Sequence, residues 1–196
     1  QAFGAGDFTK GHVRLAQRRY ANAGNHGVGR AQEIIHSKNM NAVGCVVSLH
    51  IAPAGAAVMQ TLNQVQAVAG RGLEGDRYFA RIGTYSNNAG SGREVTLIES
   101  EAIEALKRDY GVEIAAAQAR RNLVTRGVAL NHLIERQFTV GAVTLRGTRL
   151  CDPCAHLEKL SRKGALRGLI HRGGLRAEII TGGVIRIGDT ITPMGD

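Results

Sequence analysis

The sequence has few of the residues that usually mark a protein's class. It has no tryptophan, and aromatic residues make up 4% of the 196 residues; there are three cysteines and three prolines. An odd and low cysteine count argues against a disulfide framework and is typical of a reducing compartment. No run of about 18 apolar residues indicates a transmembrane helix. No apolar signal-peptide segment follows the basic residues near the start. We therefore expect a cytoplasmic protein with no membrane partner.

The residues that are abundant predict a β-rich fold. Hydrophobic residues make up 43% of the chain, and there are 26 glycines. A core with few aromatic residues must consist of Val, Ile, Leu and Ala, and frequent glycine indicates many tight turns. Apolar patterns predict strands at residues 45–51, 62–68, 93–98, 122–125, 138–140, 143–150, 177–180 and 184–191. We expect a mainly β fold, a small barrel or sandwich, with a few peripheral helices.

One longer helix is predicted at residues 100–110. Ser100 suits the N-cap, basic residues near the end suit the helix dipole, and Gly111 suits the stop. Shorter helical segments are expected near residues 115–120, 155–159 and 165–171.

The net charge of +9 is unevenly distributed. Residues 1–39 contain six Lys or Arg and two Asp or Glu, with few large apolar residues. We interpret them as a basic, flexible extension before a domain at residues 40–196; the alternative is an N-terminal helix packed on the domain. The positive charge favours anionic partners. A nucleic-acid-binding β-barrel without catalysis is an alternative function, although few aromatic residues are available to stack on bases.

The most distinctive local motif is Cys151-Asp152-Pro153-Cys154. A strand that ends at Leu150 and a turn at Pro153 would place Cys154 at the start of a short helix. The helix dipole and nearby basic side chains would there stabilise a thiolate. A thiolate can act as a nucleophile, a persulfide carrier or a soft metal ligand.

Three other interpretations of the motif remain open. The two thiols could be half of a zinc site that His156 and His171 complete. They could form a redox pair, although the chain lacks the βαβ pattern of thioredoxin-like proteins. They could also be two inert, buried thiols.

Arginine-rich segments and a glycine loop are further candidate features. Arginine forks and glycine-rich turns bind phosphate well; the candidate anion-binding residues are Arg121, Asn122, Arg126, His171, Arg172 and Arg176. The loop at residues 72–78 contains Glu74 and Asp76. We interpret it as a structural loop held by a contact between Asp76 and Arg77, with acid–base chemistry as the alternative.

Together these segments resemble the MOSC family, named for the C-terminal domain of molybdenum cofactor sulfurases. The resemblance covers about residues 42–193 and rests on segments in the family's order, at residues 72–77, 93–99, 120–127, 138–141, 151–154 and 182–189. It implies a closed β-barrel like the barrel domain of pyruvate kinase, with a few peripheral helices.

The resemblance also implies a function for Cys154. In related proteins the matching cysteine is proposed to ligate molybdenum in a pterin cofactor, for the reduction of N-hydroxylated compounds, or to carry persulfide sulfur. The cofactor's phosphate would then be bound by the arginine groups above. A sulfur carrier would be loaded by a partner cysteine desulfurase, which would bring its own pyridoxal phosphate. A reductase would need a separate electron-donor protein and a small-molecule substrate.

Overall fold

The computed structural model describes residues 44–86 and 92–195; the predicted extension at residues 1–39 lies outside them. The strands are β1 (Gly44–Ile51), β2 (Gln60–Leu62), β3 (Gln64–Val68), β4 (Gly72–Leu73), β5 (Val95–Glu99), β6 (Leu123–Arg126), β7 (Gln137–Val140), β8 (Val143–Leu150), β9 (Leu175–Thr181), β10 (Gly183–Arg186) and β11 (Thr190–Pro193). The helices are α2 (Ser100–Tyr110), α3 (Ala155–Leu160) and α4 (Ala165–Gly168), with 3₁₀ turns η1 (Ala116–Ala119) and η2 (Leu130–Leu133).

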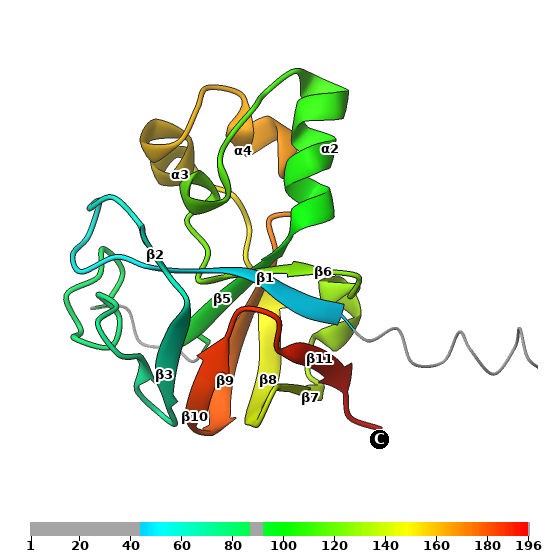
Figure 1. Ribbon diagram of the computed structural model, residues 1–196. Coiled ribbons are helices and arrows are strands. Elements are labelled where there is room, and N and C mark those ends of the chain that lie inside the picture. The colour runs from blue at the N-terminus through cyan, green and yellow to red at the C-terminus, as the bar shows by residue number, and fades with distance from the viewer. Residues whose placement is uncertain (1–43, 87–91, 196) are drawn as a thin grey trace, which may run out of the picture. The chain divides into compact units, whose positions relative to one another are not determined.

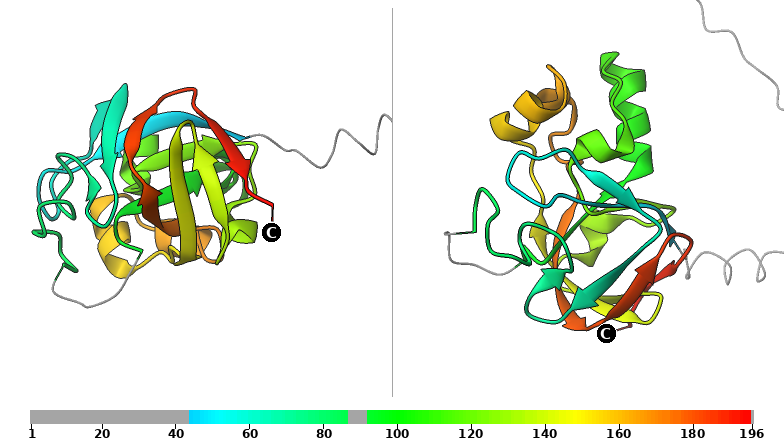
Figure 2. Two further views of the ribbon diagram at one scale, coloured as in Figure 1. Left: turned by 90° about the horizontal axis from the view of Figure 1, so that it is seen from below. Right: turned by 60° about the vertical axis from the view of Figure 1, so that its left-hand side comes forward.

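Seven strands form a closed barrel, as the resemblance to the MOSC family implies (Figures 1 and 2). Their order is β11-β7-β8-β9-β5-β6-β1, and β11 closes the ring because it pairs with both β7 and β1. Strands β5 and β6 run parallel, and the other neighbours in the ring are antiparallel. Closure removes the exposed sheet edges that would otherwise favour aggregation.

The main apolar core fills the barrel and extends under a small second sheet. That sheet has the order β10-β3-β4. Phe138 and Leu97 of the barrel and Ile185 of the small sheet are fully buried in one continuous cluster. The core is mainly aliphatic, as expected for a chain with few aromatic residues.

The helices cover the outside of the barrel next to β5 and β6 (Figure 1). Strand β5 is buried on both faces: Val95 and Leu97 point into the barrel core, whereas Ile98 packs in a second cluster with Leu106 of α2 and Leu169 after α4. The predicted peripheral position of the helices is therefore confirmed.

Some predicted boundaries differ from the structure. Ser100 is the first helical residue of α2, and Glu99 occupies the cap without a side-chain cap bond. The Glu99 carboxylate instead accepts a hydrogen bond from the Leu130 N–H at 2.7 Å, so a tertiary contact replaces the local cap. The C-terminal stop is confirmed, since Gly111 has the left-handed φ of 65°.

Two predicted long strands are each divided. The segment at residues 62–68 separates into β2 and β3 at Asn63, which lets the chain leave β1 and join the small sheet. The segment at residues 184–191 separates into β10 and β11 at the turn that contains Gly188. In both cases the chain changes sheets, and an apolar pattern alone cannot reveal such a change.

Within the described part of the chain, no helix combines the length and apolar character that crossing a membrane requires.

Candidate functional site

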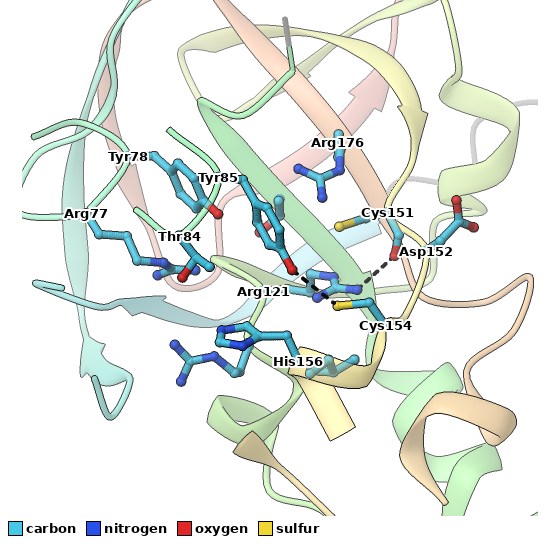
Figure 3. A pocket seen from close by; sticks show the side chains of 13 residues that line it. Arg77, Tyr78, Thr84, Tyr85, Arg121, Cys151, Asp152, Cys154, His156 and Arg176 are labelled. Carbon is cyan, nitrogen blue, oxygen red and sulfur yellow. Dashed lines mark hydrogen bonds between the residues drawn. The ribbon is translucent and has the colours of Figure 1, made fainter. Parts of the chain in front are cut away.

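A pocket open to solvent lies where the loop before β5, the start of β6, the end of β8 and strand β9 meet (Figure 3). Its lining residues are Arg77, Tyr78, Thr84, Tyr85, Thr96, Arg120, Arg121, Cys151, Asp152, Cys154, His156, Leu157 and Arg176. The cavity has a volume of about 70 Å³, room for several water molecules. A larger ligand would therefore also occupy the open mouth of the pocket.

Cys154 lies at the mouth of this pocket. Strand β8 ends at Leu150, and Cys154 is the extended N-cap residue of the six-residue helix α3, with φ of −144° and ψ of 167°. The Cys154 side chain is exposed. The inert, buried-thiol interpretation therefore does not fit Cys154.

Tyr85 faces the Cys154 thiol across the pocket. Its Oη atom lies 4.0 Å from Cys154 Sγ, and its ring meets the His156 ring edge-on (Figure 3). Burial and the nearby negative charge of a Cys154 thiolate raise the pKa of Tyr85. The phenol therefore stays protonated and can donate a hydrogen bond to the sulfur or to a ligand held there.

Cys151 has a different environment from Cys154. It is 2% exposed, and its backbone N–H donates to the Gly174 carbonyl at 2.7 Å. Its own carbonyl accepts a hydrogen bond from Arg121. The turn that carries Cys154 is thereby anchored at its first residue.

Arg121 is the group that fixes this turn. Its Nε donates to the Gly173 carbonyl at 2.9 Å, and its two Nη atoms donate to the carbonyls of Ala119 at 3.3 Å and Cys151 at 2.8 Å. The side chain is buried. Arg121, one of the predicted anion-binding residues, thus lines the pocket, but three of its five N–H donors are bound to backbone carbonyls.

Arg176 lines the pocket without comparable partners. Its Nε atom is buried and has no hydrogen-bond partner among the residues that the structure describes. Strand pairing places Arg176 opposite Thr96 of β5 and Arg149 of β8. A buried donor without a partner is costly, and an acceptor on a bound ligand would satisfy it.

Asn122 supports the pocket from behind. It is buried, and its Oδ1 accepts hydrogen bonds from both the N–H and the hydroxyl of Thr96, at 3.1 and 2.8 Å. Its Nδ2 donates to the His50 carbonyl and to Asp76 Oδ2. Asn122 therefore holds a pocket residue, Thr96, and does not line the pocket itself.

The remaining predicted anion-binding residues do not line this pocket. The Arg126 guanidinium pairs with the Glu104 carboxylate of α2. Arg172 pairs with Asp109 at 3.0 Å, and the exposed His171 has its carbonyl bound by Asn131.

The glycines between α4 and β9 have a packing role. Both Gly173 and Gly174 are buried. Gly174 has a φ of 102°, and a Cβ atom there would lie 1.9 Å from the Leu97 carbonyl oxygen. These glycines let the chain cross β5 at close range. This close approach explains why glycine occupies both positions, and phosphate binding is not needed to explain it.

The zinc interpretation gains no support. Over residues 44–86 and 92–195, no three His, Cys, Asp or Glu side chains gather as potential metal ligands.

The predicted site residues omit several residues of the pocket, above all Arg77, Tyr78, Tyr85 and Arg120. The predicted contact between Asp76 and Arg77 exists, with Arg77 Nη1 3.2 Å from Asp76 Oδ2. Asp76 also accepts a hydrogen bond from the Tyr78 N–H, so that it fixes two neighbouring residues of the pocket. The predicted contact therefore indicates the pocket as well as the loop structure.

The sequence matches the model of the MOSC domain at residues 84–192. The structure is similar to YuaD from Bacillus subtilis, with a TM-score of 0.66 and 18% identity over 78% of this chain and 96% of that one. It is also similar to YiiM from Geobacillus stearothermophilus, with a TM-score of 0.59 and 14% identity over 78% and 75% of the two chains. For YiiM from Escherichia coli the TM-score is 0.54 and the identity 15%, over 80% and 70%. Comparison with curated proteins gives no match.

Proposed function

The chain belongs to the MOSC domain family, and from this premise we propose that Cys154 ligates molybdenum in a bound pterin cofactor, in a protein that reduces N-hydroxylated compounds. The observation that supports this proposal is an exposed thiol at the mouth of a pocket lined by four arginines, Arg77, Arg120, Arg121 and Arg176. A soft thiolate suits molybdenum, and clustered guanidinium groups suit an anionic cofactor.

The residues present fit such a cofactor. The unpartnered Nε of Arg176 matches an oxygen acceptor, and the phosphate of the pterin cofactor supplies one. Cys154 supplies one soft sulfur donor. When bound, the cofactor would supply a redox-active metal that can accept an oxygen atom from a substrate.

The chain's own residues would position and protonate the ligand. Arg121 holds the Cys151 carbonyl and so fixes the turn that presents Cys154. Tyr85 keeps its phenolic proton next to the sulfur and can donate it as a hydrogen bond or to a leaving oxygen. The electrons would come from a separate donor protein.

A sulfur carrier is the second candidate, and the exposure of Cys154 favours it. A thiol that carries persulfide sulfur must reach the active site of a partner, here a cysteine desulfurase that contains pyridoxal phosphate. Cys154 meets this requirement, and the buried Cys151 does not.

Metal and pterin analysis of purified protein tests the proposal. We expect the full chain from a bacterial host that makes the cofactor to contain molybdenum and pterin in equal amounts. The Cys154→Ser variant should lose the molybdenum. The matched control is Cys45→Ser, a half-buried cysteine of β1 that does not line the pocket, and it should keep the metal.

The sulfur-carrier candidate gives a different result. In that case the purified protein contains neither molybdenum nor pterin, and Cys154 gains cyanide-labile sulfur after incubation with a desulfurase. This result would replace the first proposal with the sulfur carrier. Equal molybdenum in the wild type and in Cys154→Ser would exclude Cys154 as the ligand.

A further inference from the structure

The chain directly after Cys154 carries an excess of positive charge. Between Cys154 and Gly173 it contains five Lys or Arg and one acidic residue. The exposed cations among them are Lys159, Arg162, Lys163 and Arg167. The acidic residue is Glu158, and its Oε2 accepts hydrogen bonds from the N–H groups of Gly164 and Leu166 at 2.8 and 3.0 Å. The segment that forms α3 and α4 therefore presents a basic surface next to Cys154.

The exposed lysines of this segment differ from the cations of α2. Lys107 of α2 pairs with Glu113 at 2.7 Å, and Arg108 pairs with Asp109 at 2.7 Å. Over residues 44–86 and 92–195, no carboxylate pairs with Lys159 or Lys163. The two lysines can therefore meet carboxylates of a partner protein. Exposed lysines are common on protein surfaces, so the surroundings of these two decide whether they mark an interface.

An apolar cavity lies beside Lys159. It has a volume of about 350 Å³, and its lining residues are Ala56, Val58, Met59, Ala117, Gln118, Arg120, Lys159 and Leu160. Val58 is 85% exposed, more than any other large hydrophobic side chain in the part of the chain that the structure describes. Protein interfaces combine an apolar centre, where side chains of one partner fill pockets of the other, with a polar rim. The cavity and Val58 supply such a centre, and the lysines supply a charged rim.

Helix α3 connects this cavity with the pocket that contains Cys154. Near its start, His156 and Leu157 line the pocket, and at its end Lys159 and Leu160 line the apolar cavity. The helix has six residues, so that it spans about 9 Å. A protein seated on the cavity would therefore come close to Cys154. Electron transfer requires such an approach, because its rate falls steeply with distance.

We infer that this face, formed by the apolar cavity with Val58, Lys159 and Lys163, is the docking surface for an acidic electron-donor protein. Carboxylates of the donor would meet the lysines, an apolar side chain would enter the cavity, and the donor's redox group would lie near Cys154. Reduction of an N-hydroxylated compound R–NHOH to R–NH₂ and water takes up two electrons, which the donor supplies, and two protons, which come from the solvent. The inference rests on the proposed function, because it takes the protein as a reductase that needs electrons.

The apolar part of the face favours a protein partner over a nucleic acid. Surfaces that bind nucleic acids are more polar than protein interfaces, and those that bind single strands use aromatic side chains to stack on bases. The described residues that line the cavity include no aromatic side chain, and Val58 at its edge is aliphatic. Such a lining suits an apolar side chain of a protein.

Binding of flavodoxin, a small acidic flavin protein, to the full chain without cofactor tests the surface by calorimetry. We expect saturable binding that weakens as the salt concentration rises, because salt screens charge pairs. Lys159→Glu and Lys163→Glu should each weaken binding at low salt about fivefold or more. The matched control is Arg186→Glu, which changes the net charge equally. Arg186 is exposed on β10, at the opposite end of the domain from α3 (Figure 1), and this variant should bind like the wild type.

Two further measurements test the apolar centre and the closeness to Cys154. Val58→Ser should weaken binding without changing its salt dependence, and a side chain that is 85% exposed can be replaced with little effect on folding. Bound flavodoxin should also slow the labelling of Cys154 by iodoacetamide, followed by peptide mass. Cys45, which is half-buried on β1 and does not line the pocket, should be labelled at an unchanged rate.

Four results would overturn the inference. Equal weakening by Arg186→Glu would show attraction to the overall charge alone. A short DNA duplex that binds more tightly than flavodoxin, and that loses affinity in the two lysine variants, would make the face a nucleic-acid surface. Unchanged labelling of Cys154 in the complex would place the donor elsewhere. If neither flavodoxin nor an acidic ferredoxin binds to a chain that holds molybdenum through Cys154, the docking surface is rejected and the proposed function stays intact.

Discussion

At the scale of single residues, two arginines of one pocket wall have different roles because their partners differ. Arg121 donates to three backbone carbonyls. Arg176 has a buried Nε without a partner in the part of the chain that the structure describes. The first arginine is used by the fold, and the second is available to a ligand.

Stability measurements distinguish these two roles. Arg121→Met should lower the free energy of unfolding by about 2–4 kcal/mol, because three buried carbonyls lose their donor. Arg176→Met should change it by less than about 1 kcal/mol, while the cofactor content of protein from a competent host should fall. Urea unfolding of both variants checks this, with the exposed Arg167→Met as control. Equal destabilisation by the two substitutions would contradict the assignment.

At the scale of elements, buried polar side chains connect neighbouring strands by hydrogen bonds. His50 of β1 is 3% exposed, and its ring nitrogens lie 2.9 Å from Ser48 Oγ and 3.1 Å from Thr61 Oγ1 of β2. Its carbonyl is bound by Asn122, which also holds Thr96 of β5. This network links β2, β1 and β5 beside the pocket.

The network makes stability depend on pH. Burial lowers the pKa of His50 from its ordinary value of 6.5. Between the two values the unfolded chain binds more protons at His50 than the folded protein does, so acidification favours unfolding. The contribution of neutral His50 is therefore complete above about pH 6.5 and is lost as the pH falls through this window.

Unfolding at pH 7.5 and 5.5 checks the sign. The wild type should lose stability on acidification, and His50→Gln, although less stable at pH 7.5, should lose less between the two pH values. His132→Gln, at an exposed histidine of η2, should behave like the wild type. An unchanged pH dependence in His50→Gln would show that other groups cause the loss.

At the scale of the whole molecule, the closed barrel depends on pairing between distant parts of the chain. Strand β11 pairs with both β1 and β7 and so completes the ring. The barrel strands all lie between residues 44 and 193. We expect the domain at residues 40–196 to fold without the preceding segment.

Two deletions test this expectation. Removing residues 1–39 should leave the thermal midpoint of the barrel unchanged, because no barrel strand is lost. Removing residues 190–196 should prevent cooperative unfolding, because β1 and β7 then lose a common neighbour. Circular dichroism melts of both proteins give the result. A large drop in the midpoint after the first deletion would favour an N-terminal helix packed on the domain.

The strand-rich class, the family and the placement of Cys154 directly after a strand could all be predicted from the sequence. Apolar alternation marks strands such as β5 and β8, and an order of short motifs identifies the MOSC pattern, because both are local properties of the chain. The turn at Pro153 likewise places Cys154 directly after β8.

The charged groups that accompany Cys154 could not be predicted from the sequence, because they depend on tertiary contacts. Arg126 and Arg172 look as suitable as Arg176 in the sequence, but Glu104 and Asp109 of α2 pair with them. Arg77 and Arg120 line one pocket because the loop after β4 contacts the chain just after β1, where the Arg77 N–H donates to the Ala52 carbonyl, and β1 pairs with β6. Periodicity and composition report the neighbours of a residue along the chain, whereas an ion pair or a pocket depends on neighbours that are distant in the sequence.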